Sequence, residues 1–423
     1  MLGRKILTVD GERVEIIRPG VRNGDAGPDF LNARLRIGEQ EWVGNVEIHV
    51  RASDWYRHGH DGDPAYDNVV LHVVAVNDRR VTLSDGRRLP QSVVTFPQGF
   101  FAMYARLAAK VGDVPCSDRL GELPSLVVAD WIETLSVERM QAKARRILDL
   151  CKALGNDWEQ TAFVMLARSL GFGLNGDPFE MLARSLPLKV AWHHADNPMQ
   201  VEALLFGQAG MLDMSVNIFN EYYQTLCREY YFLSRKYSLS PIPSSSWRFA
   251  RTRPQNFPHR RIAMLATVCC RQVPLFSGVT RRGATASEIR ETLSVPLSGY
   301  WERNVDFSSG GTGRAPSSLS EASIDLLMIN FAAPLLYAYG ASVGDPDVVE
   351  RGMRIWESLR AENNTYVRQW KTVGIPSSNA AHSQALLQLR KEYCDADRCL
   401  DCRFGHALLR SEVAPLLESC GKS

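Results

Sequence analysis

The hydrophobic pattern of the chain changes its period once, and this change constrains the fold more than any other feature. Up to about residue 100, runs such as RVEIIR and FLNARLRI alternate apolar with polar residues, and NVVLHVVAV is apolar on both faces, as in a central strand. From Pro124 onward the apolar residues recur at helical spacing, beginning with SLVVADWIETLSVERMQAKARRILDLCKAL. We therefore predict an α+β (or α/β) chain, with a mixed β-sheet domain at residues 1–115 and a larger, mostly α-helical domain at residues 116–423.

Composition limits the classes of protein to which the chain can belong. Its 423 residues are 45% hydrophobic and 23% charged, which is ordinary for globular proteins, and the net charge of +2 means that any nucleic-acid surface must be local. Nine cysteines, an odd number, and an N-terminus without a signal-peptide pattern predict a reducing, cytoplasmic compartment. The most apolar run, LLMINFAAPLLYAYG, is short and contains Asn330 and Pro334, so we expect a buried core helix and no membrane contact.

The strand-like stretch GNVEIHV, residues 44–50, carries two ionisable side chains on one face. Successive side chains of a strand alternate, so Glu47 and His49 face one way while Val46, Ile48 and Val50 face the other. Burying an unpaired carboxylate costs roughly several kcal/mol, so a buried pair needs partners, water or a metal ion. The alternative is a half-exposed strand with the pair on the surface.

A second carboxylate precedes the neighbouring strand. Asp29 directly precedes FLNARLRI, and a short turn at Gly38-Glu39 would fold this strand antiparallel to the one that carries Glu47. Such a hairpin places Asp29 beside Glu47. Two converging carboxylates are ligands for Mg²⁺ or Mn²⁺, and such an ion promotes hydrolysis of phosphodiesters.

A proline-aspartate pair before one strand and Glu-x-basic on the next resemble the core motif of the PD-(D/E)XK nucleases. The resemblance implies a metal-dependent nuclease acting on DNA or RNA. Asp29 and Glu47 would bind the metal, and His49 stands where a lysine usually positions the attacking water. Histidine supplies no fixed charge, but it can orient water, move a proton or ligate the metal.

Nearly the whole chain is also similar to a bacterial family known as domain of unknown function 2851. The similarity rests on long segments that include NGDAGPDF, GNVEIHVRASDW, LLFGQAGML, RTRPQNFPHRRIA, AHSQALLQL and YCDADRCLDC. The name of this family records no activity.

The segment DWYRHGHDGDPAYDNVVLHVV contains further ionisable residues. His58-Gly-His60 resembles the HxHxDH motif of zinc hydrolases of the β-lactamase type, but Gly-Asp follows where Asp-His is required. The other interpretation is that residues of this segment orient the ligands of the carboxylate metal. His72, inside an apolar strand, is expected to be a hydrogen-bonded core residue. The auxiliary residues predicted on this basis are His60, Asp61 and Asp54.

The segment 230–287 contains no Asp or Glu, whereas Arg and aromatic residues are interleaved along it. A locally basic segment attracts a phosphate backbone, and arginine with aromatics suits unstacked bases. The alternative is that these arginines pair with acids on other helices. The predicted partner is a nucleic acid, bound by Arg248, Arg251, Arg253, Arg260 and Arg261.

A cysteine cluster near the C-terminus has the spacing of a metal site. Cys394-x4-Cys399-x2-Cys402 is followed by His406, and two thiolates of a CxxC pair with a third upstream cover most of a tetrahedron. The predicted ion is Zn²⁺, with an iron–sulfur cluster as the alternative, because some nucleases of the resembled superfamily carry one. The spacing leaves the fourth ligand open among His406, Cys420, Cys269 and Cys270.

These features predict a cytoplasmic Mg²⁺-dependent nuclease, with a C-terminal structural metal site between residues 394 and 406. Two other hypotheses stay open. One is a catalytically inactive nucleic-acid-binding or assembly protein that retains the nuclease fold. The other is a zinc hydrolase centred on His58 and His60.

Overall fold

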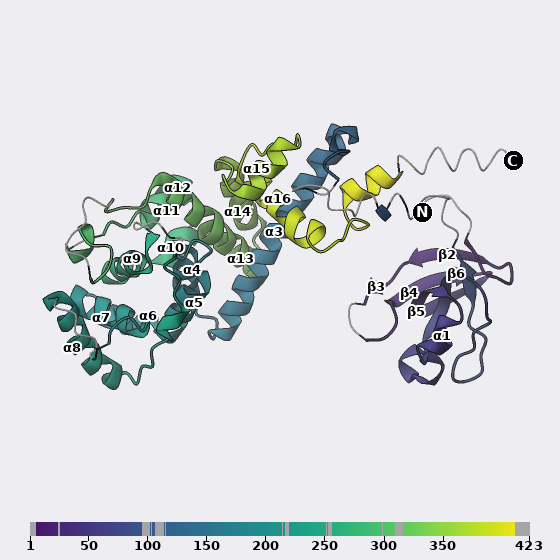
Figure 1. Ribbon diagram of the computed structural model, residues 1–423, viewed down its shortest axis with the longest axis horizontal. Coiled ribbons are helices and arrows are strands. Elements are labelled where there is room, and N and C mark those ends of the chain that lie inside the picture. Colours follow the sequence, from purple (N-terminus) through teal and green to yellow (C-terminus); the bar gives the residue numbers. More distant parts are fainter. Residues whose placement is uncertain are drawn as a thin grey trace. The chain divides into compact units, whose positions relative to one another are not determined.

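The computed structural model describes residues 6–23, 26–94, 102, 104–105, 114, 116–213, 215, 220–250, 252, 256–297, 299–308 and 316–410. The chain divides into two compact units, a sheet unit within Met1–Tyr104 and a helical unit, Ala105–Ser411. Figure 1 shows the strands gathered in the first unit and the long helices in the second. The predicted α+β organisation, with an N-terminal mixed sheet and a larger helical part, is confirmed at this level.

The sheet is mixed because its two halves pair differently. Strands β2, β4 and β5 form an antiparallel meander, whereas β5, β6 and β7 run parallel, and β3 pairs with β4. The turn at Gly38-Glu39 joins β4 to β5 with Ile37 opposite Gln40, as the sequence predicts. Gly38 has a φ of +59°, which a two-residue hairpin turn requires. The strands are β1 Ile6–Leu7, β2 Arg13–Arg18, β3 Val21–Arg22, β4 Phe30–Ile37, β5 Gln40–Arg51, β6 Val69–Val76 and β7 Gln91–Val93.

The connection from β5 to β6 carries most of the predicted auxiliary residues. It consists of helix α1 (Asp54–Arg57) and two single turns, η1 (His60–Gly62) and η2 (Pro64–Tyr66). Trp55 and Tyr66 are buried in a small apolar cluster with Val69, and this cluster fixes the connection against the sheet. The connection therefore covers one face of β5 and β6.

The helical unit is organised around α3, which packs against α13 and α16 (Figure 1). The carboxylate of Asp157 accepts a hydrogen bond from the N–H of Gln160 at 2.9 Å and caps α4, because the first turn of a helix leaves its N–H groups without partners. Its helices are η3 Leu120–Glu122, α3 Ser125–Ala153, α4 Trp158–Leu170, α5 Gly176–Ser185, α6 Leu188–His193, α7 Pro198–Gln208, α8 Glu221–Lys236, η4 Ser244–Ser246, α9 Pro258–Cys270, α10 Leu275–Thr280, α11 Ala286–Leu293, η6 Gly299–Glu302, α12 Glu321–Leu327, η7 Met328–Ala332, α13 Ala333–Val343, α14 Pro346–Ser358, α15 Thr365–Thr372, α16 Ala380–Gln388 and η8 Leu389–Cys394.

One helical stretch, Glu321–Val343, is long and apolar enough to cross a membrane. The most apolar window of this stretch is 61% buried inside the protein, as in the core helix of a globular domain. Its middle, η7, is a π-helical turn directly before Pro334. Proline lacks an N–H and collides with the carbonyl four residues earlier, so a wider turn relieves this collision.

Candidate functional site

The β4–β5 hairpin brings two carboxylates together through reciprocal hydrogen bonds. The N–H of Asp29 donates to Oε2 of Glu47 at 3.0 Å, and the N–H of Ile48 donates to Oδ2 of Asp29 at 3.0 Å. Each carboxylate is therefore oriented by the backbone of the other strand. The structure agrees with the predicted convergence of Asp29 with Glu47.

The β5–β6 connection adds two histidines to the same place. Nε2 of His49 lies 3.1 Å from Nδ1 of His58, and one ring nitrogen from each of His49, His58 and His60 lies within 4.8 Å of the others. Oε1 of Glu47 lies 3.4 Å from Nε2 of His49 and 3.5 Å from Nε2 of His60. Among the described residues, these three histidines are the group compact enough to hold a metal ion.

The donor spacing fits a small divalent ion. Four ligands placed tetrahedrally about 2.0–2.1 Å from an ion stand roughly 3.4 Å from one another. The distances of 3.4 and 3.5 Å from Glu47 to its two imidazole neighbours are close to this value. Three imidazoles and a carboxylate suit Zn²⁺ or Mn²⁺ better than Mg²⁺, which prefers oxygen ligands.

His72 on β6 holds the imidazole of His49 from behind. Its Nε2 lies 2.9 Å from Nδ1 of His49, and its own Nδ1 is buried without a hydrogen-bond partner. A neutral imidazole that offers Nε2 to a metal carries its proton on Nδ1, so we assign the proton of this contact to Nδ1 of His49, from which it donates to Nε2 of His72. His72 is fully buried, as predicted for a core histidine, and it also belongs to the site.

Burial controls the protonation of the site. It raises the pKa of Glu47 to about 7, and the charge of Asp29 adds to this effect while the hydrogen bond from the N–H of Asp29 opposes it. Burial lowers the pKa of His49 to about 4, and His60 and His58 lower it further. It also lowers the pKa of His72 to about 3. At neutral pH the rings of His49 and His72 are thus uncharged and offer nitrogen lone pairs.

The apolar residues of β5 predict that Ile48 and Val50 are buried and that the face with Glu47 is exposed. The structure shows the opposite. Glu47 is only 5% exposed, whereas Ile48 is 46% and Val50 69% exposed. The ionisable face is enclosed because the β5–β6 connection folds back over it. A Cβ on Gly44 would lie 2.4 Å from a methyl group of Val70, so glycine is needed where β6 approaches the irregular start of this stretch.

The predicted auxiliary residues differ in how they relate to the site. The ring of His60 stacks on Tyr66 at 3.7 Å and faces the ligand cluster. Asp54 is buried, accepts a hydrogen bond from the N–H of Arg51 at 3.0 Å, and stabilises the start of α1. Asp61 is exposed and reaches the site only through its charge on His60. The sequence places His58 only in the alternative zinc-hydrolase centre and not among the residues of the carboxylate site. Its position two residues before His60 is the feature of the sequence that could have added it to this site.

Two arginines of the predicted nucleic-acid surface are buried, and the prediction is wrong for both. Arg260 is fully buried, and its guanidinium donates to the carbonyls of Trp301 (2.7 Å), Asn304 (3.0 Å) and Pro316. Arg261 is 4% exposed, its guanidinium lies 4.9 Å from the centre of the Phe172 ring, and burial lowers its pKa to about 10. Neither guanidinium can contact a phosphate backbone without unfolding its surroundings.

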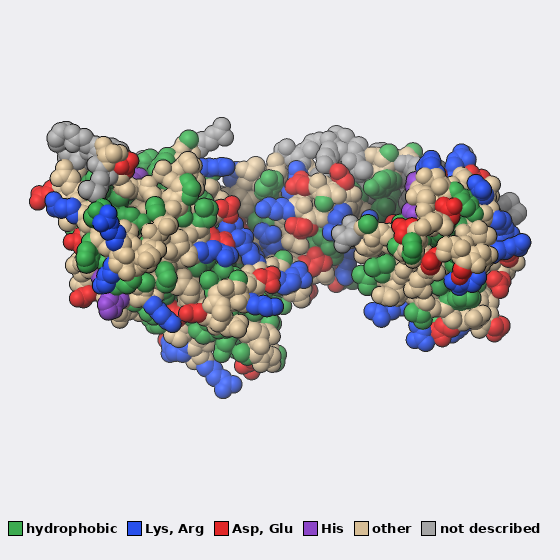
Figure 2. Space-filling view, turned by 90° about the horizontal axis from the view of Figure 1, so that it is seen from below, with side chains coloured by type: hydrophobic (Ala, Val, Ile, Leu, Met, Phe, Trp, Pro, Cys, Tyr) green, Lys and Arg blue, Asp and Glu red, His purple; other side chains and the backbone are tan. Residues whose placement is uncertain are grey.

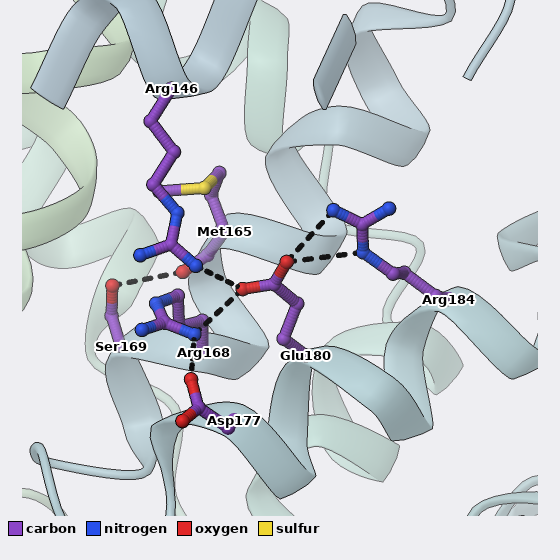
Figure 3. Close-up of polar contacts among 7 residues, drawn as sticks. All are labelled: Arg146, Met165, Arg168, Ser169, Asp177, Glu180 and Arg184. Atoms are coloured by element: carbon purple, nitrogen blue, oxygen red, sulfur yellow. Dashed lines mark hydrogen bonds and ion pairs between the residues drawn. The ribbon is translucent and has the colours of Figure 1, made fainter. Parts of the chain in front are cut away.

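Arg248 is exposed and belongs to a different basic surface, whereas Arg251 and Arg253 lie outside the described residues. Figure 3 shows Arg146, Arg168 and Arg184 converging on Glu180, with N···O distances of 2.6, 2.7 and 2.8 Å. Arg168 also binds Asp177, and the charges of Arg146 and Arg248 reach the same carboxyl. We define the Glu180 surface as Arg146, Arg168, Asp177, Glu180, Arg184 and Arg248.

The predicted cysteine ligands lie in the helical unit. Cys394 and Cys402 are buried in an apolar cluster around Trp131, and Cys399 lies in the loop between them. His406 is exposed, and Cys420 lies outside the described residues. Cys116, which the spacing did not suggest, packs against the same apolar cluster.

The chain belongs to the family described as Protein of unknown function (DUF2851), whose model matches residues 3–365. The comparisons with curated proteins and with solved structures give no match. Membership of the family confirms the similarity that extends over the sequence. Because its description names no activity, the function has to be argued from the site.

Proposed function

We propose that the chain is a metal-dependent phosphodiester hydrolase, a nuclease acting on DNA or RNA, with its catalytic site in the sheet unit. The observation that supports this most directly is the convergence of Asp29 and Glu47, through reciprocal backbone hydrogen bonds, at a cluster of histidine nitrogens. The two carboxylates and the basic residue two positions after Glu47 match the PD-(D/E)XK motif residue by residue, except that His49 replaces lysine.

The metal would be held by the imidazoles of His49, His58 and His60, with Glu47 next to His49 and His60 and Asp29 beside Glu47. The sequence predicts Mg²⁺ or Mn²⁺ on oxygen ligands, whereas the nitrogen-rich donor set favours Mn²⁺ or Zn²⁺. When bound, a divalent ion polarises a phosphoryl oxygen and makes a neighbouring water more acidic.

The side chains around the ion have separate tasks. His72 fixes the ring of His49 through one nitrogen, which aims the other nitrogen at Glu47. Partners of this kind orient a ligand and set its tautomer. Trp55 packs edge-on against His60 and at a tilt against His72, and it excludes water from the back of the site.

Contact with the nucleic acid is proposed for the Glu180 surface of the helical unit. Four arginines there face two carboxylates, so the surface keeps a net positive charge. On the face drawn in Figure 2, Lys and Arg side chains are interspersed with Asp and Glu, so the charge is local and not a molecule-wide field.

The test is cleavage of labelled single- and double-stranded DNA and RNA by the purified full-length chain with Mg²⁺, Mn²⁺ or Zn²⁺. We expect Glu47→Gln and Asp29→Asn each to reduce cleavage by about 10³-fold or more, since each removes a charge that holds the ion. Glu39→Gln is the matched control, because Glu39 is an exposed carboxylate in the turn of the same hairpin. It should leave cleavage unchanged.

Three other outcomes contradict the proposal. Cleavage that survives both site substitutions would place the activity elsewhere. Salt-sensitive nucleic-acid binding without cleavage under any metal condition would support the inactive binding protein. Hydrolysis of other esters that needs Zn²⁺ and His58, but not Asp29, would support the zinc hydrolase.

A further inference from the structure

We propose that Cys116 completes a four-thiolate metal centre with Cys394, Cys399 and Cys402. The centre would lie within the helical unit and join the segment before α3 to the segment after α16. It is independent of the proposed hydrolase site. Cys116 replaces the fourth ligands that the sequence spacing left open.

The loop that carries the three downstream cysteines folds back on itself. It begins at η8, a π-helical turn that ends at Cys394, and the N–H of Arg398 donates to the carbonyl of Tyr393 at 2.8 Å. The residues after Cys402 return to the middle of the loop at Cys399. A Cβ on Gly405 would lie only 2.1 Å from the carbonyl oxygen of Cys399, so the two backbones are in close contact. Only glycine permits this closure, which keeps Cys399 beside the residues that follow Cys402.

Hydrogen-bond donors already point at the sulfur of Cys402. It accepts from the N–H groups of Phe404 and Gly405, a pattern that stabilises a thiolate more than a thiol. Nε1 of Trp131 approaches the same sulfur but is buried without a hydrogen-bond partner. An unpartnered buried N–H is uncommon, and a metal-bound thiolate would supply its acceptor.

Cys116 faces the same place from far upstream in the chain. It packs against the apolar cluster that contains Cys394 and Cys402, and its φ of +55° is rarely adopted by residues other than glycine. Cys116, Cys394 and Cys402 thus meet at one apolar cluster although they lie far apart in the sequence.

Among the described residues, the other candidates for the fourth ligand do not reach this place. His406 is exposed, and its main chain only donates to the carbonyl of Cys402. Cys269 is fully buried in the larger core around α9, and Cys270 packs against that core. Neither belongs to the apolar cluster around Trp131.

The spacing of the sulfurs favours an iron–sulfur cluster over a single zinc ion. Tetrahedral zinc, with bonds of about 2.3 Å, draws its thiolates to roughly 3.8 Å from one another. Among the described residues, no three cysteine sulfurs lie within 4.8 Å of one another, whereas three histidine nitrogens do. A polynuclear cluster places its iron atoms between the thiolates and so holds them farther apart.

The experiment is metal analysis and absorption spectroscopy of the full-length chain purified without oxygen. Wild type should contain iron with a visible charge-transfer band, or one zinc per chain if the occupant is a single ion; either result identifies the metal of a four-thiolate centre. We expect Cys116→Ser and Cys402→Ser each to lower the bound metal at least tenfold. Cys151→Ser, which alters a buried cysteine on α3 outside this group, should retain it.

A second measurement covers the case in which Cys116→Ser does not fold. In the native wild type, alkylation followed by mass spectrometry should find Cys116, Cys394, Cys399 and Cys402 protected together, and all four reactive once the metal is removed. Wild type without iron or zinc would refute the proposal. So would Cys116→Ser with full metal content, or Cys116 alkylated while the other three stay protected. Nuclease activity is not a readout, so failure here is separate from failure of the hydrolase proposal.

Discussion

Two buried glutamates, one in each unit, have their pKa raised by burial to the same value of about 7, but their surroundings differ. Glu47 faces two imidazole nitrogens and the carboxylate of Asp29. Glu202 on α7 accepts a hydrogen bond from the O–H of Tyr222, whose oxygen accepts another from Nε1 of Trp301 at 2.8 Å. The first group meets other ionisable side chains, whereas the second is satisfied by neutral partners.

The same contrast extends to the buried bases of the two units. His49 and His72 hold each other in the sheet unit, and one nitrogen of His72 has no partner. Arg260 in the helical unit donates to three backbone carbonyls. Ionisable groups that converge on one another indicate a functional site, whereas groups dispersed among carbonyls and hydroxyls stabilise the fold, even where one nitrogen, such as Nε of Arg260, has no partner. Substitutions at the Glu47 cluster should therefore change activity, and those at dispersed buried groups such as Arg260 should change stability.

The largest effect is expected for His49→Lys, which restores the residue usual in the resembled nucleases. The ring of His49 lies between nitrogens of His58 and His72, at 3.1 and 2.9 Å, so a lysine would place an ammonium among imidazoles and remove a metal ligand. We expect metal-dependent cleavage to fall about 10³-fold, with the free energy of unfolding changed by about 1 kcal/mol or less. Single-turnover cleavage and urea unfolding measure the two quantities.

The opposite result would be equally informative. If His49→Lys cleaves as fast as wild type or faster with Mg²⁺, His49 stands in for the lysine and is not a ligand. His49→Gln controls for loss of the imidazole without a new charge, and it should lose activity to a similar extent.

Arg260→Ala is expected to show the reverse pattern. The substitution leaves one buried and two partly buried carbonyls without donors, and a buried unsatisfied polar group costs about 1–3 kcal/mol, so we expect the free energy of unfolding to fall by about 3 kcal/mol. Arg271→Ala is the control, since Arg271 is exposed at the end of the same helix. Urea unfolding of both variants measures the difference.

The nucleic-acid affinity of Arg260→Ala decides whether this residue belongs to the binding surface. Under conditions where the variant is folded, we expect its affinity and the salt dependence of binding to match wild type. Weaker binding with unchanged stability would show that the guanidinium is accessible, and the contrast between the two units would fail.

The sequence predicts the parts of the site that depend on local geometry. Asp29 and Glu47 could be paired because side-chain alternation and a two-residue turn fix the register of a hairpin. The covered face of β5 could not, because it depends on how the β5–β6 connection folds back, and Ile48 is exposed as a result. Likewise, the composition of an arginine-rich segment does not tell whether its side chains face solvent. Arg260 instead donates to backbone carbonyls that lie 41 to 56 residues downstream.

Distance along the chain also explains what was missed in the helical unit. The spacing of Cys394, Cys399 and Cys402 is visible in the sequence, but no spacing rule connects them to Cys116. Only the packing of the segment before α3 against the C-terminal loop brings these residues together. The fold class could be predicted because the hydrophobic period stays the same over tens of residues on each side of the change. A single contact between distant residues leaves no such pattern in the sequence.

The smallest effect concerns the pH dependence of stability and tests Glu202 directly. Its pKa is about 4.5 in the unfolded chain and about 7 in the fold, so the folded state binds more protons between these values. The contribution of Glu202 to the free energy of unfolding should therefore be highest below pH 4.5, fall as the pH rises and level off above pH 7. One pKa unit corresponds to about 1.4 kcal/mol, and with some solvent access the total loss should be about 2 kcal/mol.

Glu202→Gln keeps an acceptor for Tyr222 but cannot ionise, so its stability should exceed that of wild type at pH 8 and equal it at pH 4. Glu291→Gln, on an exposed side chain of α11, controls for the general loss of a carboxylate. Urea unfolding of the three chains between pH 4 and 8 isolates the contribution of Glu202, because every other acid titrates alike in all of them. If the free energy of unfolding depends on pH in the same way in wild type and Glu202→Gln, ionisation of the Glu202 carboxylate does not destabilise the fold. Glu202 would then have a charged partner in solution, and the contrast with Glu47 would be lost.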